Sequence, residues 1–175
     1  ERLKSELDGK GLEGRDLAFA YELSHGVVRR ERLLDFVLSG FAHRGLPKDP
    51  QLLNVLRLGV HQLLFVAGMP THAAVHETVK LAKSNKPFVN AILRNVTKVI
   101  EDREADPSAA TRELAITASR TLVLPKPLPA DEVERLSVVH SLPDWLTHRV
   151  AEQHGIDGLR AVAQAASDTP GINLR

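Results

Sequence analysis

The stretch QLLNVLRLGVHQLLFV, residues 51–66, carries apolar side chains around nearly its whole helical circumference. Asp49 and Pro50 precede it, and an Asp followed by Pro at the first helical position is a typical start signal of a helix. A helix that is apolar nearly all round is buried, because it presents no polar face to water. The stretch therefore predicts a central helix that the other elements enclose.

Amphipathic segments on both sides of this stretch predict an all-α fold. Their apolar residues recur with a period of about 3.6 residues, which is the period of a helix. We expect helices at residues 15–28, 31–42, 72–84, 88–101, 131–140, 143–154 and 158–166. Together with the central helix, they predict a compact helical bundle with a short helical C-terminal extension.

The composition changes after residue 104. Residues 105–130 contain four prolines and a run that is typical of extended chain, from Arg120 to Pro125. We therefore expect three parts: a helical domain over residues 1–104, a proline-containing linker over residues 105–130, and a helical extension over residues 131–175.

Composition excludes several classes of protein. The chain has 175 residues, 43% of them apolar, which is enough to build the core of one domain with an appendage. It contains no Cys, which excludes disulfide scaffolds, thiolate metal sites and a cysteine nucleophile. No apolar run approaches the ~18–20 residues of a membrane span, and from the charged first residues we expect no signal peptide. We expect no contact with a membrane and a reducing compartment, the cytoplasm.

Charge is distributed unevenly along the chain, although the formal net charge is only +1. Residues 51–100 carry six Lys and Arg against a single acid, Glu77, whereas residues 101–150 carry six against nine acids. Such an asymmetry favours a surface that faces a polyanion.

The basic residues gather on helix faces. His72, His76, Lys80 and Lys83 are spaced by four, four and three residues, which places them on one face of a helix. A surface of this kind can bind RNA phosphates, and the alternative is a solvated helical face without a ligand. The candidate RNA-binding residues are Arg29, Arg30, Arg32, Lys80, Lys83, Lys86, Arg94 and Lys98. Phe88 is the only aromatic residue near the patch, and we assign it to the core rather than to base stacking.

No pattern in the sequence indicates catalysis. The glycine-rich phosphate loop, the serine elbow and the zinc-protease helix are all absent. His72 and His76 have the spacing of metal ligands, but a third ligand is not evident, so a polar helix face is the favoured interpretation. We expect His61 to be a core or boundary histidine with satisfied hydrogen bonds rather than a general base. The sequence thus predicts no catalytic residue, metal ligand or cofactor site.

Four segments occur in an order that points to a known family. They are RDLAFAYELSHGVVRR at 15–30, LRLGVHQLLF at 56–65, PTHAAVHETVKLAK at 70–83 and FVNAILR at 88–94. Together they resemble the NusB-like RNA-binding domain of bacterial rRNA cytosine-C5 methyltransferases of the RsmB (Sun/Fmu) type. SLPDWL at 141–146 is similar to the segment that joins this domain to the methyltransferase, and PGINLR at 170–175 resembles the start of the catalytic part.

This resemblance implies that RNA docking and methylation are carried out by separate domains. The family's methyltransferase uses S-adenosylmethionine and a nucleophilic cysteine, whereas this chain has no Cys and no alternation of strands and helices that would hold the cofactor. We therefore expect an N-terminal fragment that does not methylate by itself. Its expected role is to dock small-subunit (16S) rRNA for its own missing methyltransferase domain, which would bind the S-adenosylmethionine.

Two alternative functions remain open at this point. One is a transcription antitermination factor resembling NusB, against which the segment around Trp145 argues. The other is a protein-interaction module without RNA contact, whose acidic residues at 101–113 and 131–134 would face the catalytic domain. We expect Trp145 itself to be a packing anchor at a domain junction rather than a base-stacking residue.

Overall fold

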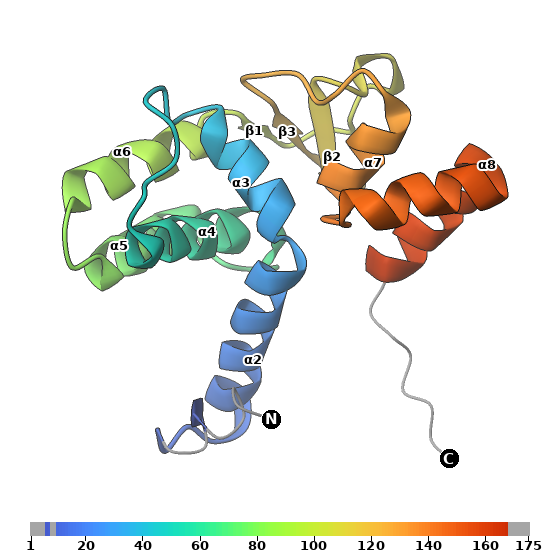
Figure 1. The fold of residues 1–175 in the computed structure, drawn as a ribbon. Coiled ribbons are helices and arrows are strands. Elements are labelled where there is room, and N and C mark those ends of the chain that lie inside the picture. The colour runs from blue at the N-terminus through green and yellow to red at the C-terminus, as the bar shows by residue number, and fades with distance from the viewer. Residues whose placement is uncertain (1–5, 8–9, 168–175) are drawn as a thin grey trace.

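The computed structural model describes residues 6–7 and 10–167, and helices make up most of this part of the chain (Figure 1). The predicted all-α class is confirmed. The predicted helices are present, with ends that differ by a few residues, and the PGINLR segment at 170–175 lies outside the described residues. The helices of the N-terminal part are α2 Gly14–Arg29, α3 Glu31–Ser39, α4 Pro50–Phe65, α5 Thr71–Leu81 and α6 Lys86–Thr97.

The buried helix that the sequence predicts is α4. It begins at Pro50, and an Asp49 carboxylate oxygen accepts a hydrogen bond from the backbone N–H of Gln51 at 2.9 Å, as the start signal predicts. α4 contacts α2, α3, α5 and α6, and Leu56 and Val60 on it are fully buried. Figure 1 shows α4, α5 and α6 grouped on one side of α3. α4 therefore supports the two helices that carry Lys80, Lys86 and Arg94 among the candidate RNA-binding residues.

Gly59 lets α5 and α6 approach α4 closely. A Cβ atom at this position would lie 2.7 Å from a methyl carbon of Leu93 on α6 and 2.9 Å from the methyl carbon of Thr78 on α5. Leu93 and Thr78 are both 0% exposed, so neither side chain has solvent to move into. A residue without a Cβ is needed for such a close approach. Because Leu93 is fixed inward, its neighbour Arg94 is directed outward.

Residues 105–130 are part of the folded core, which corrects the prediction of a linker. Three short antiparallel strands pair in the order β1-β3-β2. Their bounds are β1 Ile100–Glu101, β2 Glu113–Thr117 and β3 Arg120–Val123. Four leucines of this region belong to the same hydrophobic cluster as the helices: Leu114, Leu122, Leu124 and Leu128. The prolines lie outside the strands, so they leave the hydrogen-bond ladder intact.

An ion pair whose strength depends on pH joins the segment after β1 to the start of β2. Two guanidinium nitrogens of Arg103 donate to the Glu113 carboxylate at 3.0 and 2.6 Å, and the backbone N–H of Asp106 donates to it at 2.7 Å. These hydrogen bonds, those from Arg103 above all, lower the pKa of Glu113 from 4.5 to about 2. A carboxyl group whose pKa is lower in the folded than in the unfolded state stabilises the fold at pH values above the unfolded-state pKa. This stabilisation is lost as the pH falls through the folded-state pKa.

We therefore expect the melting temperature to decrease between about pH 4.5 and pH 2, partly through protonation of Glu113. Glu113→Gln should lower the melting temperature at pH 7 and flatten this part of the profile. Thermal unfolding followed by circular dichroism at several pH values measures both effects. The matched control is Glu152→Gln, at an exposed position of the last helix. A Glu113→Gln profile that runs parallel to that of the wild type would contradict the assignment.

The C-terminal extension packs against the N-terminal domain. It consists of α7 Glu132–Val139 and α8 Asp144–Ser167, which contact each other, and α7 also contacts α3. Gly155 interrupts α8 with a φ of 69°, at the residue where the sequence predicts a helix to stop. Leu159, beyond this break, is fully buried. Within the described part of the chain, no helix has both the length and the apolarity that crossing a bilayer requires.

Trp145 does not act as a packing anchor within the described residues. Its side chain is 68% exposed, although the adjoining segment is well fixed. The Ser137 hydroxyl shares its single proton between the Leu142 carbonyl at 2.8 Å and an Asp144 carboxylate oxygen at 2.9 Å. The indole of Trp145 is therefore exposed to solvent, on a segment that these hydrogen bonds hold in place.

Candidate nucleic-acid interface

A groove with a volume of about 830 Å³ lies between α5 and α6. We call it the α5–α6 groove. Its polar lining consists of Thr71, His72, His76 and Glu77 from α5 and of Asn90, Arg94 and Thr97 from α6. The structure thus brings the histidines, which are exposed, to the same surface as Arg94, from which they are separated by some twenty residues of sequence. No cluster of three metal-ligating side chains exists among residues 6–7 and 10–167.

One flank of α6 carries a row of uncompensated cations. Lys86, Asn90, Arg94 and Lys98 are spaced by four residues and so share this flank. The Arg94 Nε donates to the Asn90 side-chain oxygen at 3.1 Å, which orients the guanidinium along the helix. Lys86, Arg94 and Lys98 form no ion pair with any residue that the structure describes. Their charge is available to an external anion.

Two other cations of the basic middle segment have partners. Arg57 on α4 donates to Asp35 at 2.7 and 2.6 Å and lies 2.7 Å from Glu31, so it joins α4 to α3. Lys80 pairs with Glu77 at 2.8 Å, and its hydrogen bond lowers the pKa of that carboxyl. This second pair is exposed and contributes little to stability, so a phosphate can replace Glu77 as the partner of Lys80.

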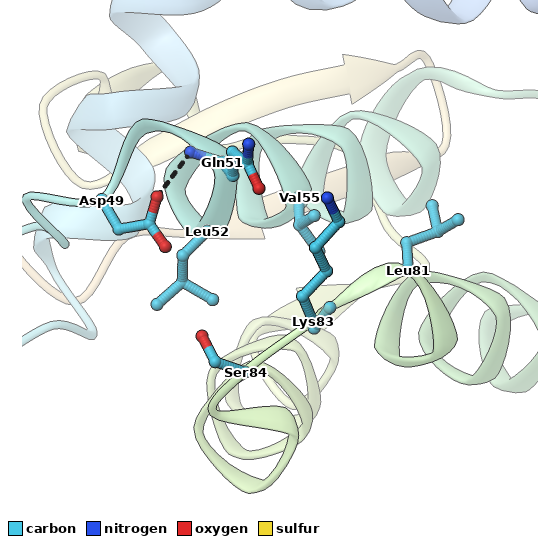
Figure 2. A pocket seen from close by; sticks show the side chains of 8 residues that line it. Asp49, Gln51, Leu52, Val55, Leu81, Lys83 and Ser84 are labelled. Carbon is cyan, nitrogen blue, oxygen red and sulfur yellow. Dashed lines mark hydrogen bonds between the residues drawn. The ribbon is translucent and has the colours of Figure 1, made fainter.

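Lys83 lies apart from the α5–α6 groove. It lines a smaller concavity of about 250 Å³ between the start of α4 and the α5–α6 turn, shown in Figure 2. Its side chain extends from the turn towards Val55 on α4, while Asp49 is engaged as the cap of that helix. The structure therefore separates Lys83 from His76 and Arg94, which line the larger groove.

The three arginines at the α2–α3 junction contact other parts of the chain. Arg29 donates to the Ala166 carbonyl on α8 at 2.9 Å. The Arg30 guanidinium lies 4.5 Å above the ring of Phe65, and Arg32 pairs with Asp144 at 2.7 Å. The sequence shows three cations but not these distant partners. In the structure, Arg29 and Arg32 hold the C-terminal extension, and none of the three lines the α5–α6 groove.

His61 is buried, as predicted, and it lies on α4 with 2% of its surface exposed. The prediction that its hydrogen bonds are satisfied is wrong for Nδ1, which has no partner among the residues that the structure describes. Burial, followed by the nearby charge of Arg30, lowers the pKa of His61 to about 4. The ring is therefore neutral at pH 7 and belongs to the core.

Four polar residues of the α5–α6 groove were not predicted as site residues: Thr71, Glu77, Asn90 and Thr97. Asn90 and Thr97 line the α5–α6 groove, although neither carries a charge that would draw attention in the sequence. The spacing from Lys86 through residue 90 to Arg94 is the signal that could have indicated Asn90. The signal for Thr97 is weaker, because a threonine near a helix end has many other roles.

Comparison with known proteins assigns this helical-bundle domain to a family. The model of the NusB family matches residues 1–98, more than half of the chain. The chain belongs to the NusB family. A putative methyltransferase of Mycobacterium tuberculosis is 33% identical over 180 residues, which cover 98% of this chain and 36% of the relative.

Two further relatives represent two kinds of protein. A probable ribosomal RNA small subunit methyltransferase B of Bacillus subtilis is 26% identical over 99% of this chain and 35% of its own length. The transcription antitermination protein NusB of Desulfovibrio desulfuricans is 32% identical over 65% of this chain and 72% of its own length. The chain thus spans about a third of the length of the methyltransferases it matches. No solved structure matches it significantly.

Proposed function

We propose that the chain is the RNA-docking domain of an rRNA cytosine-C5 methyltransferase and that its α5–α6 groove and the adjoining flank of α6 hold phosphates of small-subunit rRNA. The observation that carries this proposal is the row of Lys86, Arg94 and Lys98, which no described carboxylate neutralises, beside a groove lined by two exposed histidines. Lys and Arg release counterions when they neutralise phosphates, and this release supplies affinity.

The extent of the similarity favours a methyltransferase over an antitermination factor. The matches to the methyltransferases cover 98% and 99% of this chain, so they include α7 and α8. The match to the Desulfovibrio NusB protein covers 65% of the chain. A separate methyltransferase domain, which would bind S-adenosylmethionine, is the partner that we propose for the exposed face around Trp145. Large exposed aromatic side chains are enriched at such contacts.

The proposed role is positional. Cations on helices contact mostly the phosphates, which fixes the register of an RNA but does not read its sequence. The selection of one cytosine, and its extrusion if it is stacked in a helix, would fall to the methyltransferase domain. Arg29 and Arg32 would contribute indirectly, because they hold the C-terminal extension, whereas Arg30 packs over Phe65 of α4.

A fluorescence-anisotropy titration with a small-subunit rRNA helix at several salt concentrations tests the proposal. Three to five phosphate contacts predict that log K falls against log salt with a slope of about −3 to −4.5. A chain that does not bind this RNA even at low salt would contradict the proposal, because the α6 cations would then be merely solvated.

A further inference from the structure

The other flank of α6 borders a second concavity, which we call the loop pocket. It has a volume of about 620 Å³ and lies between the α3–α4 connection and α6. The α3–α4 connection supplies Phe41, His43 and Arg44, and α6 with its preceding residue supplies Asn85, Phe88 and Asn95. The sequence indicates only one aromatic residue near the basic patch, whereas the fold places Phe41 and Phe88 in one pocket.

The floor and the rim of the loop pocket differ in chemistry. Phe41 and Phe88 are only partly buried, and with Leu52 and Ile92 they form an apolar floor. The rim carries amide and cationic groups. Asn85 begins α6 in a left-handed conformation, with a φ of 53°, and its side chain makes no capping hydrogen bond.

The charge of the loop pocket suits an RNA strand. No carboxylate lines it, and Arg44 forms no ion pair within the described part of the chain. α6 alone separates the loop pocket from the cationic flank of Lys86 and Arg94. A helix measures about 10–12 Å across with its side chains, so one RNA strand that crosses α6 can contact both flanks.

We propose that the loop pocket receives one unpaired nucleobase of the RNA whose phosphates lie along the cationic flank of α6. This inference rests on the proposed function and adds that the preferred RNA contains an unpaired nucleotide. Bases stack on phenyl rings, and Asn amides match the hydrogen-bonding edges of bases. A phosphate or an acidic peptide does not suit the apolar floor, and the volume lies within the range of roughly 300–1,000 Å³ typical of small-ligand sites.

The test compares two RNAs of equal length: a hairpin with 2-aminopurine in its unpaired loop, and a fully paired duplex with 2-aminopurine inside the helix. We expect the chain to bind the hairpin more tightly and to quench its 2-aminopurine fluorescence by stacking. Phe88→Leu should weaken hairpin binding about tenfold, since one stacked base contributes about 1–3 kcal/mol. Binding of the duplex should remain within about twofold of the wild type.

Because Phe88 also packs on the core, a second variant keeps the test independent of folding. Asn85→Gly removes the amide and retains a residue that tolerates a positive φ. It should weaken hairpin binding, and it should leave duplex binding and the melting temperature nearly unchanged. Circular dichroism of both variants checks that the helices persist.

Two outcomes would overturn the inference, and they can be told apart. If the hairpin binds without a change in 2-aminopurine fluorescence, and both variants bind it like the wild type, the loop pocket holds no base. Salt-dependent binding of both RNAs would then still support the docking function. If neither RNA binds at low salt, the docking function and the inference are both wrong.

Discussion

The double variant Lys86→Glu, Arg94→Glu is expected to bind small-subunit rRNA about a hundredfold more weakly than the wild type at low salt. Each substitution replaces a cation that no described carboxylate neutralises with a negative charge beside the α5–α6 groove. Loss of two phosphate contacts should also reduce the slope of log K against log salt by about 2. Both side chains are exposed, so the helices should remain folded. Anisotropy titrations at four or five salt concentrations measure the affinity and the slope together.

The matched control is Arg15→Glu, Arg149→Glu, which makes the same change of net charge at exposed positions of α2 and α8. We expect this control to retain an affinity within about threefold of the wild type, because only the general electrostatic attraction changes. If the control loses as much affinity as the groove variant, RNA binding depends on net charge, and the assignment to α6 is wrong.

The second large effect concerns the junction of α4 with α6. Leu93→Ala should destabilise the fold by about 2–5 kcal/mol, because Leu93 is fully buried against Gly59. Gly59→Ala alone should cost about 1–3 kcal/mol, since its new methyl group would lie 2.7 Å from a Leu93 carbon. In the double variant, the methyl group fills part of the space that Leu93 vacates. The double variant should therefore lose less unfolding free energy than the two single variants lose in sum. Urea unfolding of the three variants measures these losses.

Leu159→Ala on α8 provides the control for this coupling. Leu159 is as deeply buried as Leu93, but it belongs to the C-terminal extension. The loss of unfolding free energy caused by Leu159→Ala should add to that caused by Gly59→Ala within about 0.5 kcal/mol. If the losses of unfolding free energy caused by Gly59→Ala and Leu93→Ala are additive, the close packing on which the orientation of Arg94 depends is contradicted.

The fold was predictable from the sequence wherever the signal is local. The apolar run at 51–66 and the Asp49 cap define α4, and Gly155 marks the break in α8, because both depend on neighbouring residues in the chain. The extended run from Arg120 predicts β3, but the pairing of the sheet was not predictable in this way. β2 and β3 are short, and β1 pairs with β3 from some twenty residues away. Four prolines in 105–130 favour a linker, although one lies between β1 and β2 and the other three follow β3, so none interrupts a strand.

The candidate site was predictable in part. The spacing of His72, His76 and Lys80 on α5 and of Arg94 and Lys98 on α6 indicates the faces of the two helices, but not that the helices form a groove. Arg29 and Arg32 have the same charge as the groove residues, and only the fold reveals their partners on α8 and in the segment before it. Phe41 joins Phe88 through the course of the α3–α4 connection, which no period in the sequence reveals.

The most direct test of RNA docking is a map of backbone amide chemical shifts, recorded by heteronuclear NMR on the ¹⁵N-labelled chain as small-subunit rRNA is added. The account predicts that the largest changes fall on α5, α6 and the connection between them, with Lys86 and Arg94 among them. Changes that concentrate on α7 and α8, or an RNA that binds without perturbing α6, would contradict it.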